Sequence, residues 1–187
     1  MVYQKKNSVI RMKVFYSWLI LCGLVFVSCS NEKLVKPDPY EGPMLEMYDF
    51  ETLYSDSARL KIRFTGPYEY ELQNGDKVFP EGVYMEFFDV ETGEMTSTLK
   101  GNEARYFKDR NIYVVNSDVV VQNLKEKNKL SSEELVWNPT EKKITTEKFV
   151  RIETPCEVMT GDGMVSNEDF TSYRILKPSA NIFMDCE

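Results

Sequence analysis

Apolar and polar residues alternate along most of the chain from about residue 57 onward. Leu60, Ile62 and Phe64, for example, are separated by Lys61 and Arg63. Successive side chains of a β-strand point to opposite faces of the sheet, so a period of two predicts a strand with one buried face. The segments with this alternation or with a short apolar run are 58–65, 68–72, 83–88, 95–99, 104–106, 112–115, 119–121, 135–137, 149–152, 170–175 and 182–184.

Turn signals separate these segments at intervals of about 8–12 residues, which is typical of a sandwich, barrel or roll. The signals are Asn74-Gly75, Thr92-Gly93, residues 108–111, Asn138-Pro139 and Asp162-Gly163. Asparagine, aspartate and glycine tolerate the positive φ angles that tight turns require. The pattern therefore predicts an all-β fold of antiparallel strands.

The first 28 residues have the features of an export signal. Four basic residues and no acidic one are followed by an apolar run from Val14 to Val27. This run is shorter than the roughly 20 residues of a membrane-spanning helix. It ends at Ser28-Cys29, where a bacterial lipobox has its cysteine. We expect residues 1–28 to be a signal peptide, cleaved before Cys29, with acylation of the Cys29 thiol.

The residues after the signal divide into a tether and a domain. Pro37, Pro39 and Pro43 favour a semi-extended segment, and regular alternation begins only beyond it. We expect a lipidated N-terminus and tether at 29–53 and a single β-domain at 54–187. A domain of this size can build its own core.

The charge of the expected mature chain limits its partners. The whole chain has 23 basic and 30 acidic residues, and removal of the four basic residues of the signal gives 19 − 30 = −11. Phosphates attract lysine and arginine, so an acidic domain argues against a nucleic-acid partner. It also argues against adhesion to anionic headgroups, so the acyl anchor would have to provide the attachment to a membrane.

The residue type at the centre of many catalytic and metal sites is missing. The chain has no histidine, which removes Ser-His-Asp triads, Cys-His dyads and the usual zinc sites. Carboxylate pairs such as Asp89 with Glu91 do not by themselves give the separation across a cleft that a glycosidase requires. We predict no enzymatic activity, no cofactor and no metal. Cys156 and Cys186 are either a disulfide or two buried thiols.

The apolar rows predict an interior that has two possible uses. Aromatic residues make up 13% of the chain. A densely packed core explains them, and so does an elongated roll that holds acyl chains, because ligand sites are mostly apolar. The candidate inward-facing, ligand-binding residues are Leu60, Ile62, Phe64, Met85, Phe87, Tyr106, Ile112, Val119, Val121, Trp137 and Val150.

Several short motifs between Tyr54 and Ile175 carry a resemblance to a known family. They are residues 54–60 (Tyr-Ser-Asp-Ser-Ala-Arg-Leu), 79–83 (Phe-Pro-Glu-Gly-Val), 104–106 with 109–113, 135–137 with 144–146, 161–164 (Gly-Asp-Gly-Met) and 169–173 (Asp-Phe-Thr-Ser-Tyr). Their order, their spacing and their position after a membrane anchor resemble the LptC family of the lipopolysaccharide export machinery, in the lipoprotein form of Bacteroidetes-type bacteria.

The resemblance implies an open β-jellyroll that joins other rolls edge to edge and carries acyl chains in a continuous groove. It implies a non-enzymatic protein that receives lipopolysaccharide from the inner-membrane ABC transporter. The protein would pass it to a periplasmic LptA-like bridge protein, towards the outer membrane. The implied location is the periplasmic side of the inner membrane of a Gram-negative bacterium. Better-known relatives have a transmembrane helix where this chain has a lipobox, so the role of that helix at the transporter cannot be carried over. Ser30 after Cys29 gives no clear inner-membrane retention signal, so anchoring in the outer membrane stays open.

An alternative function is that of a surface lipoprotein that binds glycan for a nutrient-uptake system. Glycan binding would need exposed aromatic side chains beside carboxylates. Lipid transfer would need an aromatic row that faces inward and reaches both ends of the roll.

An open roll also leaves unpaired edge strands, which can pair with another chain. We expect the C-terminal edge to meet a partner, because it has no proline and its charges lie near its ends. Pro178 would then stop the strand. The predicted edge residues are Phe170, Thr171, Ser172, Tyr173 and Ile175. The N-terminal edge at 58–64 is the alternative junction.

Overall fold

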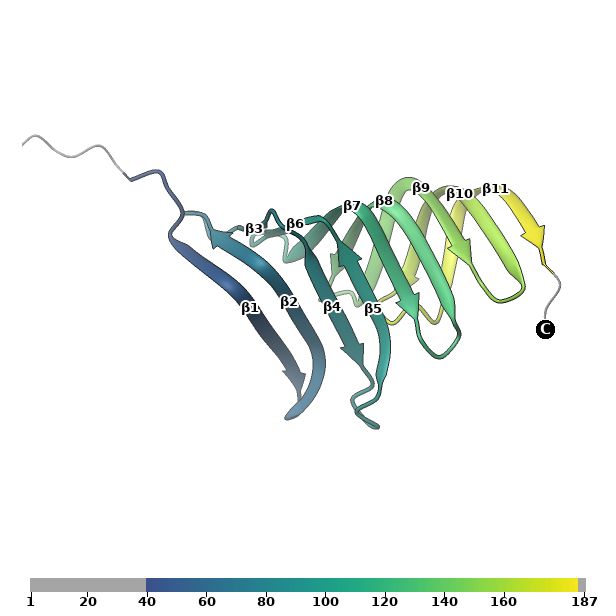
Figure 1. The fold of residues 1–187 in the computed structure, drawn as a ribbon, viewed down its shortest axis with the longest axis horizontal. Coiled ribbons are helices and arrows are strands. Elements are labelled where there is room, and N and C mark those ends of the chain that lie inside the picture. Colours follow the sequence, from purple (N-terminus) through teal and green to yellow (C-terminus); the bar gives the residue numbers. More distant parts are fainter. Residues whose placement is uncertain (1–39, 185–187) are drawn as a thin grey trace, which may run out of the picture. The chain divides into compact units, whose positions relative to one another are not determined.

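The computed structural model describes residues 40–184, which form eleven antiparallel strands and no helix (Figure 1). The expected all-β fold is confirmed. The strands are β1 (Leu45–Asp56), β2 (Arg59–Glu71), β3 (Lys77–Phe79), β4 (Val83–Phe88), β5 (Met95–Gly101), β6 (Glu103–Phe107), β7 (Ile112–Asn123), β8 (Asn128–Asn138), β9 (Lys143–Glu153), β10 (Glu157–Asn167) and β11 (Tyr173–Phe183). Within the described residues we find no helix of the length and apolarity needed to cross a membrane.

Most of the strands are long and bent in the middle. Residues 112–116 of β7 pair with β6, whereas residues 120–123 pair with β5. Strand β2 behaves in the same way, because residues 62–65 pair with β4 and residues 70–71 pair with β3. It follows that β3 and β4 are two halves of one bent path, and that β5 and β6 are two halves of another.

The bends divide the sheet into two facing walls. We call β4, β5 and the strand halves in line with them the first wall, and β3, β6 and the remaining halves the second wall. Figure 1 shows the strands following one another along the roll from β1 to β11, with paler strand halves behind those in front. This arrangement is an open jellyroll, in agreement with the sequence-based expectation.

Left-handed backbone conformations mark several of the bends. Ser117 and Asp118, between the two pairing halves of β7, have φ angles of 63° and 52°. Asp49 in β1 and Gly163 in β10 have φ angles of 50° and 75°. Glycine and aspartate are among the residues that tolerate this conformation best. The sequence therefore allows a bend without ending the strand.

Side chains from the two walls fill the space between them. Phe64 packs edge to face on Tyr113 of the opposite wall, with ring centroids 5.5 Å apart, and Phe87 packs in the same way on Trp137 at 5.8 Å. Each such pair stabilises the fold by about 0.5–1.5 kcal/mol beyond the burial of its area. Trp137 is fully buried. The middle of the roll is therefore a packed aromatic core.

The two walls are offset along the roll. The Tyr54 hydroxyl of β1 lies 2.6 Å from the Tyr113 hydroxyl of β7, and the Tyr54 ring contacts Trp137 of β8. Lys61 of β2 reaches Glu168, between β10 and β11, at 2.8 Å. The first-wall half of each of these early strands thus faces the second-wall half of a strand that comes later in the chain. As a result, one wall extends beyond the other at each end of the roll. We call the end at β1, β2, β3 and β6 the N-terminal mouth, and the end at β10 and β11 the C-terminal mouth.

The domain starts earlier than the sequence pattern predicted. Strand β1 begins at Leu45, so residues 45–53 belong to the sheet and the tether prediction is wrong for them. Most side chains of β1 are exposed, and the left-handed Asp49 lies in its middle. This edge strand therefore lacks the clean alternation that would have identified it.

The C-terminal strands also differ from the prediction. Residues 168–172 form a turn, so the predicted strand at 170–175 is correct only from Tyr173 onward. Pro178 lies inside β11, beside a register shift, and does not end the strand. Edge strands and bulges tolerate proline, because no ladder hydrogen bond is lost. Asp162-Gly163 is a bend within β10 and not a turn between strands.

Candidate functional site: the interior and its two mouths

The residues predicted to face inward mostly share one interior. Eight of them belong to the buried cluster between the walls: Ile62, Phe64, Met85, Phe87, Val119, Val121, Trp137 and Val150. Tyr106 is partly buried and packs against this cluster, whereas Leu60 and Ile112 are half-buried and lie outside it. Leu60 is next to a register shift between β1 and β2, which interrupts the alternation on which its prediction rested.

The interior also contains residues that the sequence pattern did not identify. The buried cluster also contains Phe50, Phe79, Val83, Leu99, Ala104, Tyr113, Val115, Leu130, Leu135, Ile144, Ile152, Met164 and Phe170. Phe50 was hidden in the expected tether, and Phe79 belongs to a strand of three residues. Phe170 was assigned to an exposed edge but is fully buried. No local pattern identifies it, because it enters the core from a turn.

The N-terminal mouth has polar groups inside. Glu69 of β2 is only 2% exposed, and its carboxylate accepts a hydrogen bond from Lys77 Nζ at 2.8 Å. Glu69 lies directly opposite Met47 in the β1–β2 pair, and Met47 packs against the core. Directly opposite residues share a face, so Glu69 points into the roll. An ion pair is thus built into the interior at this end.

Tyrosine hydroxyls extend this polar region towards the middle of the roll. The Tyr54 and Tyr113 hydroxyls are hydrogen-bonded to each other, and the Tyr106 hydroxyl donates to Asn111 Oδ1 at 3.0 Å. Burial raises the pKa of Tyr113 far above its ordinary value, and the nearby Tyr54 adds to the shift. Tyr113 is therefore a neutral hydrogen-bonding group throughout the usual pH range.

The C-terminal mouth is apolar by comparison. A pocket of about 360 Å³ opens there, lined by Met159, Tyr173, Ile175, Pro178, Ser179, Ala180 and Asn181. Met159, Tyr173 and Ile175 also pack against the buried cluster, so the pocket continues the interior to the end of the roll. None of its lining residues is charged. This surface suits an apolar chain.

Strand β11 has an outer edge that pairs with no other strand of the described domain. The Asn167 N–H donates to the Ser172 carbonyl, and beyond the register shift the Met184 N–H donates to the Cys156 carbonyl. Alternate residues of an antiparallel pair exchange hydrogen bonds, so the N–H groups of Tyr173, Ile175 and Lys177 point away from β10. These are the groups that an added strand would meet. Thr171 and Ser172, predicted for this edge, lie in the preceding turn.

Exposed apolar side chains gather at the two end strands. Nine of the thirteen large ones between Glu41 and Met184 lie on β1, on β11 or beside them. They are Met44, Leu45, Tyr48, Leu53, Tyr54, Leu176, Ile182, Phe183 and Met184. The two end strands and the residues beside them therefore carry most of the large exposed apolar side chains of the described domain.

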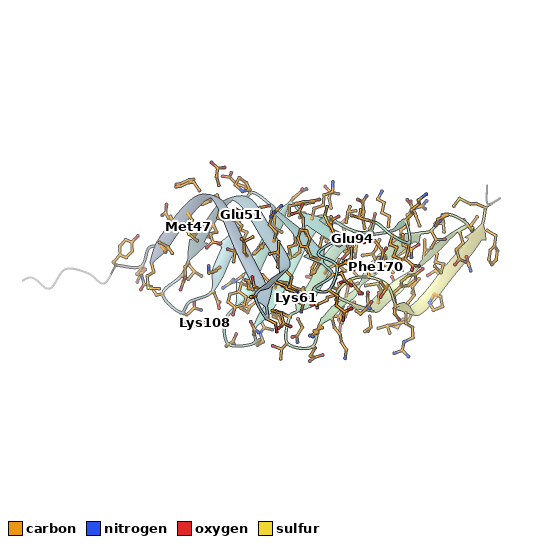
Figure 2. All side chains as sticks on the ribbon, turned by 90° about the horizontal axis from the view of Figure 1, so that it is seen from below. Met47, Glu51, Lys61, Glu94, Lys108 and Phe170 are labelled. Atoms are coloured by element: carbon orange, nitrogen blue, oxygen red, sulfur yellow. The ribbon has the colours of Figure 1, made fainter. Side chains whose placement is uncertain are left out.

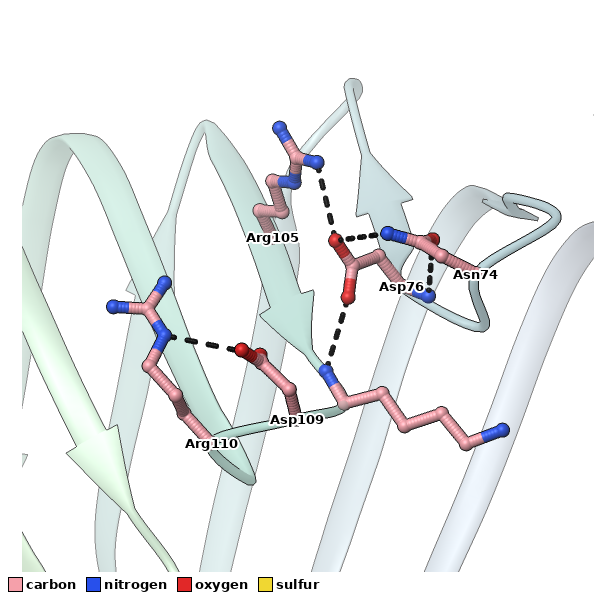
Figure 3. Close-up of polar contacts among 6 residues, drawn as sticks. Asn74, Asp76, Arg105, Asp109 and Arg110 are labelled. Atoms are coloured by element: carbon pink, nitrogen blue, oxygen red, sulfur yellow. Dashed lines mark hydrogen bonds and ion pairs between the residues drawn. The ribbon is translucent and has the colours of Figure 1, made fainter.

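A polar network braces the outside of the second wall near the N-terminal mouth (Figure 3). Asp76 accepts hydrogen bonds from the Lys108 backbone N–H at 3.1 Å, from Asn74 Nδ2 at 3.0 Å and from Arg105 at 3.2 Å. The Lys108 N–H contributes most to lowering the pKa of Asp76, and Asn74 and Arg105 act in the same direction. The network joins the β2–β3 turn to the β6–β7 turn.

An exposed aromatic surface lies on the outside of β1 and β2. Tyr48 is 71% exposed and stacks on Tyr68 with ring centroids 4.8 Å apart, and Tyr70 lies 5.9 Å from Tyr68. The Tyr48 hydroxyl approaches Glu46 at 3.5 Å. Aromatic residues beside a carboxylate are what the alternative glycan-binding function requires. The inward aromatic row is the larger of the two.

Cys29 and Cys186 lie outside the described residues. Cys156 is the only cysteine between residues 40 and 184, and it is disulfide-bonded. Among the same residues no group of three or more histidine, cysteine or acidic side chains could hold a metal ion.

Comparison with known proteins identifies the family. A family model described as lipopolysaccharide-assembly, LptC-related matches residues 18–177, which is well over half of the chain. A comparison with curated proteins gave no match. The family acts in lipopolysaccharide transport, as a periplasmic bridge component associated with the inner membrane of Gram-negative bacteria. With the match and the all-β roll, we conclude that this chain belongs to the LptC-related family of lipopolysaccharide-assembly proteins.

Proposed function

We propose that this protein carries lipopolysaccharide with its acyl chains inside the roll. It would receive the lipid from the inner-membrane ABC transporter at the N-terminal mouth and pass it to a periplasmic LptA-like bridge protein at the C-terminal mouth. The observation that carries this proposal is one apolar interior that reaches an uncharged pocket beside an unpaired strand edge. A neighbouring roll added at that edge would extend the interior without a break.

The β11 edge is the proposed junction with the bridge protein. Strand addition depends mainly on main-chain hydrogen bonds, so removal of an outward N–H should weaken it while a side-chain change should not. Lys177→Pro removes one outward donor from an exposed residue and leaves the β10–β11 ladder intact. We expect loss of binding to the bridge protein for Lys177→Pro and normal binding for the matched control Lys177→Ala. Normal binding of a folded Lys177→Pro protein would place the junction elsewhere.

Photo-crosslinking tests whether the lipid occupies the interior. A photoreactive residue at Ile175, which faces the pocket, should capture lipopolysaccharide in cells, whereas one at the exposed Leu176 should not. The two positions are adjacent and of opposite parity, so they differ mainly in the face of β11 that they probe. Equal labelling at both positions would argue against an interior path. Labelling at neither would argue against lipid carriage.

The anchor is part of the same proposal. We propose that cleavage before Cys29 and acylation of its thiol attach the domain to the periplasmic side of the inner membrane. The basis is the basic, apolar leader that ends in Ser28-Cys29. Mass spectrometry of the purified protein should detect added acyl mass on an N-terminal Cys29. A mature protein that still contains Trp18 would contradict this part of the proposal.

A further inference from the structure

The turn between β10 and β11 projects a side chain into the roll. Phe170 lies at the centre of this turn, is fully buried and belongs to the core cluster. Its ring stacks on Tyr173 with centroids 5.0 Å apart. Figure 2 labels Phe170 and Lys61 in the central part of the roll, away from Met47 near its N-terminal end. A turn residue therefore occupies space that elsewhere in the domain is filled from the walls.

The backbone of this turn is strained at the buried residue. Phe170 has a φ of 54°, in the left-handed region that bulky side chains rarely adopt. Strained conformations persist where surrounding contacts enforce them, and they concentrate at sites that bind or move. The Phe170 ring is thus held inside against a local backbone preference.

Hydrogen bonds within the turn make it a braced unit. Asn167 Oδ1 accepts the Ser172 N–H at 2.9 Å, and Asp169 Oδ1 accepts the Thr171 N–H at 3.2 Å. Asn167 Nδ2 also contacts Thr171 Oγ1 at 2.7 Å. These bonds join the turn to Asn167 at the end of β10 and Asp169 to Thr171 within the turn, so they can survive a movement of the turn together with the end of β10.

Few polar contacts attach the turn to the rest of the domain. Glu168 pairs with Lys61 of the first wall, and Asn123 Nδ2, also in the first wall, donates to the Asp169 carbonyl at 3.1 Å. The Glu168 N–H donates to the Lys142 carbonyl of the neighbouring turn. The first two contacts cross from one wall to the other. They close the open side of the roll at this point.

The ion pair that crosses the opening is incompletely satisfied. Glu168 Oε1 lies 2.8 Å from Lys61 Nζ, but the buried Glu168 Oε2 has no hydrogen-bond partner in the described part of the chain. A buried carboxylate oxygen without a partner lowers the net gain from such a pair. The contact is therefore suited to opening as well as closing.

We propose that the Glu168–Ser172 turn is a flap over a lateral entry to the acyl-chain site. The Phe170 ring fills the position of an acyl chain in the empty protein, and the arriving lipid displaces it as the Lys61–Glu168 contact breaks. This inference rests on the proposed function and adds a route from the side of the roll to the routes through its two mouths.

A cationic pocket beside the flap favours an amphiphile with an anionic headgroup. This pocket, of about 440 Å³, is lined by three basic residues and one acidic residue, together with Ser172 of the flap. The four charged residues are Lys142, Lys143, Arg174 and Glu141. Lys143 pairs with Glu141 at 3.6 Å, whereas Lys142 and Arg174 have no acidic partner among residues 40–184. An acyl chain under the flap would leave its headgroup near these cations.

Variants of the full-length protein in which the charges of Lys61 and Glu168 are reversed or swapped test the proposal. The variants are Lys61→Glu, Glu168→Lys and the double exchange, and the probe is purified lipopolysaccharide with a fluorescent label. We expect each single variant to load the probe about threefold faster or more, the size expected when a partly screened ion pair is lost. The double exchange should return the loading rate towards that of the original protein. Hydrogen exchange of residues 168–172 should rise and fall in parallel.

Arg151→Glu is the matched control, because it breaks an exposed ion pair with Glu153 of the same strand, a pair that does not cross from one wall to the other. Unchanged loading in both single variants, with the probe still bound, would overturn the flap and leave entry through the mouths. Failure of the original protein to bind the probe would overturn both the flap and the proposed function.

Phe170→Ala adds an independent measure, since an emptied site should bind the probe more tightly at equilibrium even if the protein is less stable. Weaker or unchanged binding by a folded Phe170→Ala protein would contradict the role given to its ring.

Discussion

The two mouths of the roll are built from the same kind of bent strand but differ in chemistry. The N-terminal mouth has the Glu69–Lys77 ion pair inside and a polar network around Asp76 outside. The C-terminal mouth has an uncharged pocket around Met159 and Ile175. Charges in an apolar interior require partners with fixed geometry, whereas apolar contacts adapt to a neighbour without directional demands. The N-terminal mouth is thus the more rigid end. The C-terminal mouth is the end whose apolar surface can join the interior of a neighbouring roll.

The largest expected effect comes from breaking the ion pair at the N-terminal mouth. Lys77→Met would leave the Glu69 carboxylate buried without its partner, because Glu69 is 2% exposed. We expect the free energy of unfolding to fall by about 2–4 kcal/mol, below the value for a fully buried pair because Lys77 is partly exposed. Urea unfolding followed by circular dichroism measures this loss.

A double replacement is the matched control for this ion pair. Glu69→Leu with Lys77→Met removes both charges and should recover most of the lost stability, since an apolar pair of similar volume is often neutral or better. Equal stability of the single and double variants would show that the pair does not structure this end.

Replacement of one glycine by alanine at each mouth tests whether the two ends of the roll open independently of each other. A Cβ on Gly161 would overlap the Lys177 carbonyl oxygen, so Gly161→Ala must push β11 away from β10. We expect a loss of about 1–3 kcal/mol, the range for overpacking. Hydrogen exchange should rise in residues 173–183.

Gly66→Ala is the counterpart at the N-terminal mouth. Its Cβ would lie 2.7 Å from the Phe50 ring and 2.8 Å from the Gly82 carbonyl oxygen. Hydrogen exchange should then rise in residues 45–56 and not in β11. If either substitution raised hydrogen exchange equally at both ends, the roll would open as one cooperative unit. The two mouths would then not differ in local stability.

Removing one tyrosine hydroxyl should have a smaller effect. Tyr54→Phe leaves the Tyr113 hydroxyl without the partner that lies 2.6 Å away, at an expected loss of about 1–2 kcal/mol in the free energy of unfolding. The double variant Tyr54→Phe/Tyr113→Phe removes both hydroxyls, so it should lose less than the sum of the two single changes. Strictly additive losses in thermal unfolding would contradict a coupled pair.

The smallest effect is the pH dependence of the Asp76 network. The pKa of Asp76 is lowered in the folded protein, chiefly by the Lys108 N–H, so the charged form stabilises the fold. This contribution is complete above the unfolded-state pKa of about 4 and is lost as the pH falls through the lower folded-state pKa. Asp76→Asn should therefore lower the melting temperature slightly at pH 7. The difference in melting temperature between the variant and the original protein should disappear below about pH 4. A constant difference down to about pH 3 would contradict this role of Asp76.

The alternation of residues predicted the fold class and most of the interior, because strand parity alone decides which face a side chain joins. Phe64, Phe87 and Trp137 lie in the core for this reason. Two of the errors have one physical source, which is that bends within strands look like turns or linkers in sequence. Asp162-Gly163 has turn composition yet lies inside β10, and Asp49 interrupts the pattern of β1.

The sequence pattern could not predict contacts between elements that are distant in the chain. The position of Phe170 depends on the β10–β11 turn meeting the far wall, and the Glu69–Lys77 pair depends on β2 and β3 curving to one end. Neither pair of partners is marked by local spacing. Such contacts follow from the offset of the two walls, which only the assembled sheet defines.

The unlike ends of the roll also determine how copies of it can associate. A two-fold dimer would join the same end strand of two copies, β1 to β1 or β11 to β11, and would close after two copies. Contact between β11 of one copy and β1 of the next is head to tail, and repetition of such a contact by translation gives an open filament and not a closed ring. A chain of rolls joined in this way would present β1 at one end and β11 at the other, whatever the number of copies.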